Sequence, residues 1–265
     1  MSGPASRSRP RPHSAATASP AALILACGGC SGVQSMLDPA GPAAAEIART
    51  WWIMAGGAVL ILLLVMVLLW RAMVRAPDAP PFGQGVAMIA LGGLAFPVAV
   101  LSALLVHGTA MGWRAMAMDR PPEHVVEVEA RQWSWTFRHL ADDGATLATS
   151  DDVLLMPLGR DVEFRITAAD VIHSFWIPRL GGKMDAVPGR TNLLRLRAHR
   201  AVPVRGQCAE FCGRDHAHMA FDVLVVAPSE YEAWLLAGGG PLPGRAAAER
   251  QPRARPDTHG DTGHD

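Results

Sequence analysis

The chain has 265 residues, of which 50% are hydrophobic and 18% are charged, a more apolar composition than most soluble proteins have. It carries 24 basic and 24 acidic residues, so its formal net charge is zero. This balance excludes a nucleic-acid partner held by bulk electrostatics. The composition instead favours a membrane protein whose charges act locally.

Residues 1–30 are interpreted as a signal or lipoprotein-like leader. Three arginines precede a short apolar run at residues 21–26, which is typical of an export signal. Cys27 follows Ile-Leu-Ala in a pattern that resembles a bacterial lipoprotein cleavage box, and Cys30 is a second candidate for lipidation. The alternative is an uncleaved, disordered leader with two idle cysteines. Whether this leader is cleaved or lipidated, and at which cysteine, stays open.

Residues 31–120 predict a transmembrane hairpin with helices at about residues 50–72 and 85–108. No charged side chain occurs at residues 50–70, and this run is long enough to cross about 30 Å of hydrocarbon. Residues 86–106 are also uncharged, although two glycines and a proline interrupt them. The loop between the helices carries two arginines and one acid, so the positive-inside rule places it in the cytoplasm.

Residues 121–228 predict a β domain on the outer side of the membrane. Short segments such as residues 162–166 and 192–197 alternate apolar and polar side chains, as half-buried strands do. Turns rich in Gly, Pro and Asp separate these segments, which favours an antiparallel sandwich or barrel. After the domain, residues 229–238 predict a short helix capped by Ser229. Residues 239–265 lack apolar periodicity and predict a disordered tail.

A cluster of metal-binding side chains near the end of the β domain is the strongest functional signal. Cys208, Cys212, His216 and Met219 follow one another at offsets of four, four and three residues. Two thiolates, an imidazole and a thioether form a soft ligand set that suits copper, whereas structural zinc rarely uses methionine. The alternatives are a disulfide between the cysteines and a methionine that only packs in the core. His173, at the end of another predicted strand, is a further candidate, although a lone histidine there is more often a core residue.

The pattern from His173 through residues 181–190 to residues 208–219 resembles subunit II of haem-copper cytochrome c oxidases. The two-helix hairpin and the aromatic run at residues 132–135 belong to the same resemblance, which covers roughly residues 37–236. It implies a cupredoxin-like β-barrel that holds two copper ions, the dinuclear CuA centre. The expected fold class is therefore a membrane-anchored all-β chain, in which a two-helix transmembrane hairpin precedes a cupredoxin-like barrel.

The resemblance also implies a role for each ligand. Six residues are implied to hold copper: His173, Cys208, Glu210, Cys212, His216 and Met219. The two cysteines would bridge both ions, each histidine would bind one ion, and the methionine and the backbone carbonyl of Glu210 would be weak ligands. The carboxylate of Glu210 is implied to reach a magnesium ion at the boundary with the catalytic subunit, as a hard ligand for a hard ion. A plain surface glutamate is the alternative.

The function implied is electron input to a respiratory terminal oxidase. Electrons from cytochrome c would arrive at Trp133 and pass through the copper centre to the haem and copper of subunit I, where oxygen is reduced. An ordinary core aromatic is the alternative for Trp133. Acidic side chains, Asp170 among them, are candidates to steer a basic cytochrome c. Trp176 and Phe211 are expected to pack near the thiolates, and an ordinary core position is the alternative for both. The expected location is a bacterial inner membrane, with the copper domain in the periplasm.

The second predicted helix departs from the family pattern. The family commonly carries a glutamate there, at the mouth of a proton path, whereas Ala90 stands near that place and residues 86–106 hold no carboxylate. We expect a divergent branch that takes its protons through the partner subunit. The donor's identity, the haem type and proton pumping stay open.

Four other classes of protein compete with this interpretation. The hairpin and the chain length argue against a nitrous oxide reductase copper domain, and the complete ligand set argues against a quinol oxidase subunit II. A zinc-stapled binding module and a membrane-anchored copper carrier or assembly factor without a redox relay remain. Spectra of the metal-loaded protein would distinguish them, because zinc is colourless and a carrier releases its copper readily to chelators.

Overall fold

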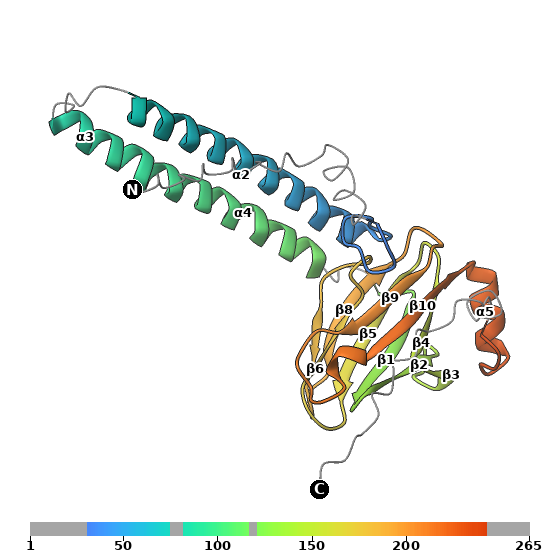
Figure 1. Cartoon of the computed structure of the whole chain (residues 1–265). Coiled ribbons are helices and arrows are strands. Elements are labelled where there is room, and N and C mark those ends of the chain that lie inside the picture. Colours follow the sequence, from blue (N-terminus) through green and yellow to red (C-terminus); the bar gives the residue numbers. More distant parts are fainter. Residues whose placement is uncertain (1–30, 75–81, 117–120, 243–265) are drawn as a thin grey trace, which may run out of the picture.

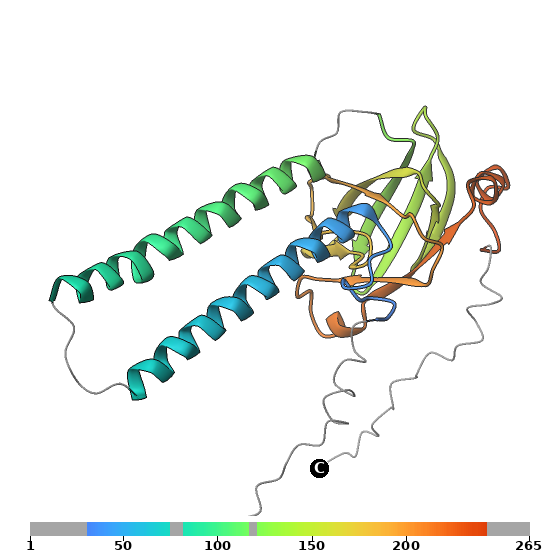
Figure 2. The same cartoon turned by 90° about the horizontal axis from the view of Figure 1, so that it is seen from above.

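The computed structural model describes residues 31–74, 82–116 and 121–242. The predicted leader, with Cys27 and Cys30, and the predicted tail from residue 243 onward lie outside the described residues. A pair of long helices projects from one end of a β domain, and a short helix packs on another side of that domain (Figure 1). Figure 2 shows the two long helices side by side and leaving the β domain in the same direction.

Helix α2 spans Pro42–Val74 and serves both the membrane and the β domain. Its 33 residues extend about 50 Å, well beyond the roughly 30 Å of a bilayer core. The first turns bury Ala44 and Ala48, and the Ala44 N–H donates to the carbonyl of Leu180 at 3.2 Å. The helix therefore begins at residue 42 rather than at about residue 50, because its amino-terminal turns pack on the domain. Proline is well suited to the first position of a helix.

The second long helix contains a π-helical turn. α3 spans Phe82–Met88, η2 spans Ile89–Ala95 and α4 spans Phe96–Met116. In the π turn the Phe96 N–H donates to the carbonyl of Leu91, five residues back. Pro97 follows directly and lacks an N–H, which disfavours ordinary α-helical bonding at this point. The turn includes Ala90, which stands near the place where the sequence resemblance led us to expect an acid.

Among the described residues, two helices are long and apolar enough to cross a membrane: Pro42–Val74, with a mean hydropathy of 2.8, and Gly85–Gly112, with 2.4. The side chains in the middle of both are exposed in the isolated chain, as lipid-facing residues would be. The helices meet near the β domain, where Thr50 Oγ1 lies 3.1 Å from Nε2 of His107. This hairpin fits a membrane protein.

The β domain of the described residues consists of two five-stranded sheets. The first sheet has the order β3-β2-β1-β5-β8, with β1 at His124–Arg131, β2 at Ser134–Leu140, β3 at Thr146–Asp151, β5 at Asp161–Ala168 and β8 at Asn192–Arg197. The second has the order β4-β10-β9-β6-β7, with β4 at Val153–Pro157, β6 at His173–Trp176, β7 at Met184–Ala186, β9 at Val204–Cys208 and β10 at Ala220–Val226.

Two strand pairs are parallel, so the predicted antiparallel arrangement is wrong at these places. β1 pairs with β5, and β10 pairs with β4, both in parallel register. The chain crosses from one sheet to the other between β3 and β4, with Asp152 between the two strands. Such crossings bring strands far apart in sequence side by side, and alternation within one strand does not reveal their direction. The predicted fold class, two apolar helices before a cupredoxin-like β domain, is confirmed.

Aromatic rings fill the space between the sheets. Trp135, Phe137, Phe175 and Phe221 are fully or almost fully buried, and the rings of Phe175 and Phe221 stack with centroids 5.1 Å apart. Trp135 and Phe137 point inward because side chains on a strand alternate between its faces. Close-packed aromatic rings resist displacement. Loops that pack against these rings therefore rest on a rigid base.

Helix α5 spans Pro228–Leu236 and packs beside β2, β3 and β4. Its N-cap is Ala227 and Pro228 is its first residue, so the prediction that Ser229 caps the helix is wrong. The hydroxyl of Tyr231 lies 2.8 Å from Nδ1 of His139, and both residues are buried. Burial lowers the pKa of His139 to about 3 and raises the pKa of Tyr231, so the pair stays neutral near pH 7.

Candidate metal centre

The loop between β9 and β10 gathers four of the predicted ligands. β9 ends at Cys208, and β10 begins immediately after Met219. The Cys208 N–H donates to the carbonyl of Met219 at 2.9 Å, which closes the loop at its base. Between these ends, η3 spans His216–His218 and turns the chain back toward the sheet. Antiparallel pairing of β9 with β10 thus brings the two ends of the motif together.

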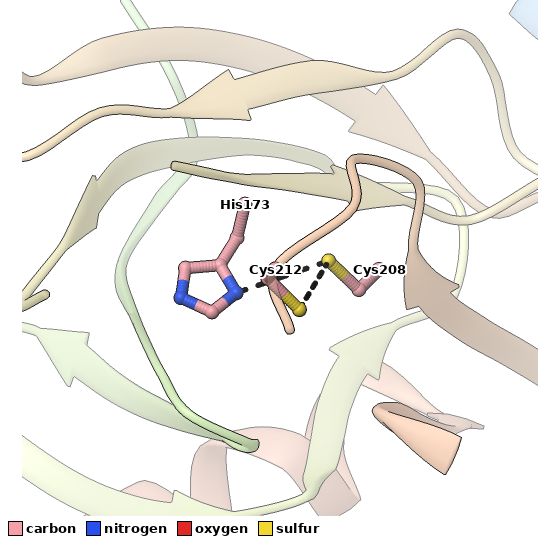
Figure 3. A group of neighbouring side chains, drawn as sticks. All are labelled: His173, Cys208 and Cys212. Atoms are coloured by element: carbon pink, nitrogen blue, oxygen red, sulfur yellow. Dashed lines mark hydrogen bonds between the residues drawn. The ribbon is translucent and has the colours of Figure 1, made fainter. Parts of the chain in front are cut away.

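His173 and the two cysteines form the buried centre of the site. Figure 3 shows His173, at the start of β6, with one ring nitrogen facing the sulfur atoms of Cys208 and Cys212. Nδ1 of His173 lies 3.9 Å from Sγ of Cys208, and the two Sγ atoms are 3.8 Å apart. Both cysteines are free thiols. The disulfide alternative requires a separation of about 2.05 Å, which the structure does not show.

The remaining predicted donors surround the same two sulfur atoms. Sγ of Cys212 lies 3.6 Å from Nδ1 of His216 and 3.7 Å from Sδ of Met219. Sγ of Cys208 lies 3.2 Å from the carbonyl oxygen of Glu210. Each of the two cysteine sulfur atoms therefore has one imidazole nitrogen and one weaker donor atom near it.

These spacings fit metal coordination. A tetrahedral first-row metal ion, with bonds of about 2.3 Å to sulfur and about 2.0 Å to nitrogen, holds its donors roughly 3.3–3.8 Å apart. The distances of 3.6, 3.8 and 3.9 Å between the thiol and imidazole donor atoms are close to this range. The donor atoms of His173, Cys208 and Cys212 all lie within 4.8 Å of one another. Two ions that shared the sulfur pair would each have one histidine within reach.

Burial disfavours ionisation of this thiol pair unless a cation binds to it. Cys208 is 5% exposed, Cys212 is 3% exposed and His173 is fully buried. Burial raises the pKa of the Cys212 thiol to about 12, and the neighbouring Cys208 thiol adds to this shift. Two adjacent thiolates are therefore unfavourable here by themselves. A bound metal ion would supply the compensating positive charge.

Asp170 orients His173 from outside the ligand set. Its Oδ1 lies 2.8 Å from Nε2 of His173 and accepts the Val171 N–H at 2.7 Å, while its Oδ2 accepts the Gln132 N–H at 2.8 Å. Partial burial opposes ionisation, but these hydrogen bonds outweigh it and lower the pKa of Asp170. The carboxylate thus holds the other ring nitrogen of His173 toward the sulfur atoms. Asp170 was expected only as a steering acid, and its bond to His173 is a feature that the sequence reasoning missed.

The turn between β1 and β2 contacts the loop between β9 and β10, which we call the ligand loop. Nε2 of Gln132 donates to the carbonyl of Cys212 at 2.8 Å, and Nε1 of Trp133 approaches the same oxygen at 3.3 Å. A Cβ at Gly213 would come within 3.2 Å of both side chains, and its φ of +119° also favours glycine. Trp133 is half-buried, so its indole joins the domain surface to the peptide of a predicted ligand. The role of Gln132 was not predicted.

The other predicted residues of the region differ in exposure. Glu210 is exposed, and only its carbonyl oxygen reaches the sulfur pair. Trp176 is half-buried and its Nε1 donates to the carbonyl of Gly181 at 3.2 Å. Phe211 is 76% exposed, so the expectation that it packs near the thiolates is wrong. The loop directs the side chain of Cys212 inward and the ring of Phe211 outward. The Phe211 ring contacts the His216 ring, with a centroid distance of 5.7 Å.

A family model described as "Cytochrome C oxidase subunit II, periplasmic domain" matches residues 138–226, a range that includes all six predicted copper ligands. The chain belongs to the cytochrome c oxidase subunit II family. Cytochrome c oxidase subunit 2 of Alkalihalophilus pseudofirmus is 32% identical to it over 227 residues, 80% of this chain and 65% of that protein. Subunit 2 of Cereibacter sphaeroides is 45% identical over 89 residues, 34% of this chain and 29% of that protein.

Among solved structures, the chain is similar to the periplasmic domain of subunit II of cytochrome oxidase from Bradyrhizobium japonicum. The TM-score is 0.40 at 30% identity, and the match covers 46% of this chain and 96% of that one. The chain spans 65% of the length of the Alkalihalophilus pseudofirmus subunit 2 and 56% of the length of a probable subunit 2 from Streptomyces coelicolor.

Proposed function

We propose that this chain is the electron-input subunit of a respiratory haem-copper oxidase in a bacterial inner membrane. It accepts electrons from cytochrome c at a dinuclear copper centre and passes them to subunit I, where oxygen is reduced. The spacing of the donor atoms along His173, Cys208, Cys212 and His216 is the main support, because it fits two ions that share a sulfur pair. Membership of the subunit II family points to the same function.

The ligand set favours copper and electron transfer over other metal chemistry. Six residues would hold the metal: His173, Cys208, Glu210, Cys212, His216 and Met219. Thiolate, thioether and imidazole donors suit copper, which when bound would supply a reversible one-electron couple. The aromatic base and the hydrogen bonds of Asp170 and Gln132 restrain the donors. Restrained donors move little between oxidation states, which keeps the barrier to electron transfer low.

Electrons arrive and leave on different sides of the ligand loop. Trp133 receives them, because its half-buried indole touches the carbonyl of Cys212 and thereby bridges the surface and the metal centre. Glu210 would lie at the boundary with subunit I, where its exposed carboxylate would bind magnesium, and its carbonyl oxygen lies 3.2 Å from Sγ of Cys208. The hairpin anchors this arrangement in the membrane. Since residues 86–106 contain no carboxylate, protons reach the oxygen-reducing site through the partner subunit.

The proposal is tested by electron uptake from cytochrome c. The full chain in detergent, with reduced thiols, is loaded with copper and mixed with reduced cytochrome c in a stopped-flow spectrometer. One cytochrome c should be oxidised for each copper pair, and the Cys212→Ser variant should oxidise none. A copper carrier would instead lose its metal to a chelator without oxidising cytochrome c, and that result would exclude the relay. A zinc module would retain zinc in preference to copper.

A further inference from the structure

The proposed electron transfer does not use a cavity that lies next to the candidate metal centre. It has a volume of about 490 Å³ and reaches two of the predicted ligands, Cys208 and His216. Met36, from the segment before α2, also lines it, together with Trp176, Gly182, Lys183, Gln207 and Ala209. Since a water molecule occupies about 30 Å³ in the liquid, this space admits an ion together with a donor group of its carrier.

Met36 is held at this cavity by contacts on both sides of it in the chain. On one side, Nε2 of Gln34 donates to Oε1 of Gln207 at 2.8 Å. On the other, the carboxylate of Asp38 binds Nη2 of Arg179 at 2.6 Å, and Arg179 is only 4% exposed. Figure 1 shows this segment, in dark blue, between α2 and the β domain. Two anchors within two residues of Met36 fix its position against the domain.

Two of the predicted side-chain ligands, Cys208 and His216, line the cavity. His173, Cys212 and Met219 are 0%, 3% and 2% exposed, respectively, and none of them lines the cavity. An ion that enters there meets Cys208 and His216 before it meets those three. Met36 adds a thioether, a soft donor that suits Cu(I), at a position outside the six predicted ligands.

We propose that Met36 is the copper-receiving ligand, which takes Cu(I) in the cavity and passes it to Cys208 and His216. This inference rests on the proposed function of the site. The Met36 sulfur forms a bond to the ion as a bond to the carrier breaks. The Cys208 thiol then releases its proton to solvent, its sulfur binds the ion, and the bond to Met36 breaks. The ion stays Cu(I) throughout, so the transfer needs neither an oxidant nor a reductant.

The test measures the rate of copper uptake by the full chain in detergent, with thiols reduced. The chain is mixed in a stopped-flow spectrometer with Cu(I) held by bicinchoninate, whose coloured complex disappears as copper leaves it. Met36→Leu keeps the side-chain size and removes the donor, so the uptake rate should fall about tenfold, as for other groups that assist a metal site. Met54→Leu is the matched control, because Met54 is an exposed residue of α2 and does not line the cavity.

Three measurements on Met36→Leu decide the result. Slow uptake with an unchanged final copper count and an unchanged Tm supports the receiving role. Uptake at the rate of the unmodified chain overturns it, and so does a lowered copper count or Tm, which would make Met36 a permanent ligand or a structural residue. The proposed function fails separately, if the unmodified chain itself does not take up two coppers.

Discussion

The variant Asp170→Asn should weaken copper binding although it removes no copper ligand. The Asp170 carboxylate serves three donors: Oδ1 faces His173 Nε2 and the Val171 N–H, and Oδ2 faces the Gln132 N–H. Asparagine has a single acceptor oxygen, so its NH₂ group must face at least one of these N–H donors. His173 then loses its charge-assisted partner, or the turn at Gln132 loses a bond.

The size of the effect follows from the exposure of Asp170. A hydrogen bond to a charged group contributes about 1.5–3 kcal/mol. Loss of a partner of this kind costs roughly 10- to 100-fold in metal affinity, or about 1.4–2.7 kcal/mol. Since the Asp170 side chain is 28% exposed, water replaces part of what the carboxylate provided. We therefore expect the lower end of the range, a loss of about tenfold.

Competition between the loaded full chain and a copper chelator measures this affinity directly. The matched control is Asp143→Asn, because Asp143 lies in the turn between β2 and β3 and its carboxylate accepts the nearby Ala145 N–H at 2.9 Å. An Asp170→Asn chain that holds copper as tightly as the unmodified chain would refute the orienting role of this carboxylate.

Three further predictions concern stability and electron input. Because burial lowers the pKa of His139 to about 3 while the unfolded chain titrates near 6.5, the unfolded state takes up the proton first. Stability should fall by up to about 1.4 kcal/mol per pH unit from pH 6.5 towards 3 in urea unfolding, and His139→Gln should flatten that slope. In Gly206→Ala the added Cβ would lie 2.0 Å from the ring of Phe221, so unfolding should show a loss of about 1–3 kcal/mol, whereas Gly182→Ala, with open space, should show none. Trp133→Leu should slow electron uptake from reduced cytochrome c at an unchanged copper count, and an equal rate would contradict its role.

Features that depend on neighbouring residues could be predicted from the sequence. The hairpin follows from two uncharged runs, because the cost of placing charge in hydrocarbon is visible in composition alone. The ligand loop is visible because Cys208, Cys212, His216 and Met219 lie close together in the chain, and their soft chemistry limits the metals they suit. The presence of strands also followed from local alternation.

Features that depend on distant contacts could not be predicted in this way. The parallel pairing of β1 with β5 depends on where the chain crosses between the sheets. The bond from Asp170 to His173 is close in sequence, but an acid three residues before a histidine is common and becomes informative only when the ring's other nitrogen faces a metal site. The segment around Met36 has no periodicity, and its contacts in the folded chain, among them those with Gln207 and Arg179, place it at the cavity.

The start of α2 shows the same limit at an element boundary. Hydropathy marks the part of a helix that lipid surrounds, whereas the turns from Pro42 to Arg49 are held by the β domain. Their small buried residues, Ala44 and Ala48, give no apolar signal that sequence alone could use. Phe211 is the converse case, because an aromatic ring beside a buried cysteine is exposed. Burial there is set by the curvature of the loop and not by residue type.

The copper content and electron paramagnetic resonance of the loaded full chain test the central claim most directly. Two coppers per chain should bind, and one unpaired electron should show hyperfine coupling to two equivalent copper nuclei. Cys212→Ser should abolish that shared signal, since it removes one bridging sulfur from a pair 3.8 Å apart. One copper per chain with coupling to a single nucleus would contradict a dinuclear electron relay.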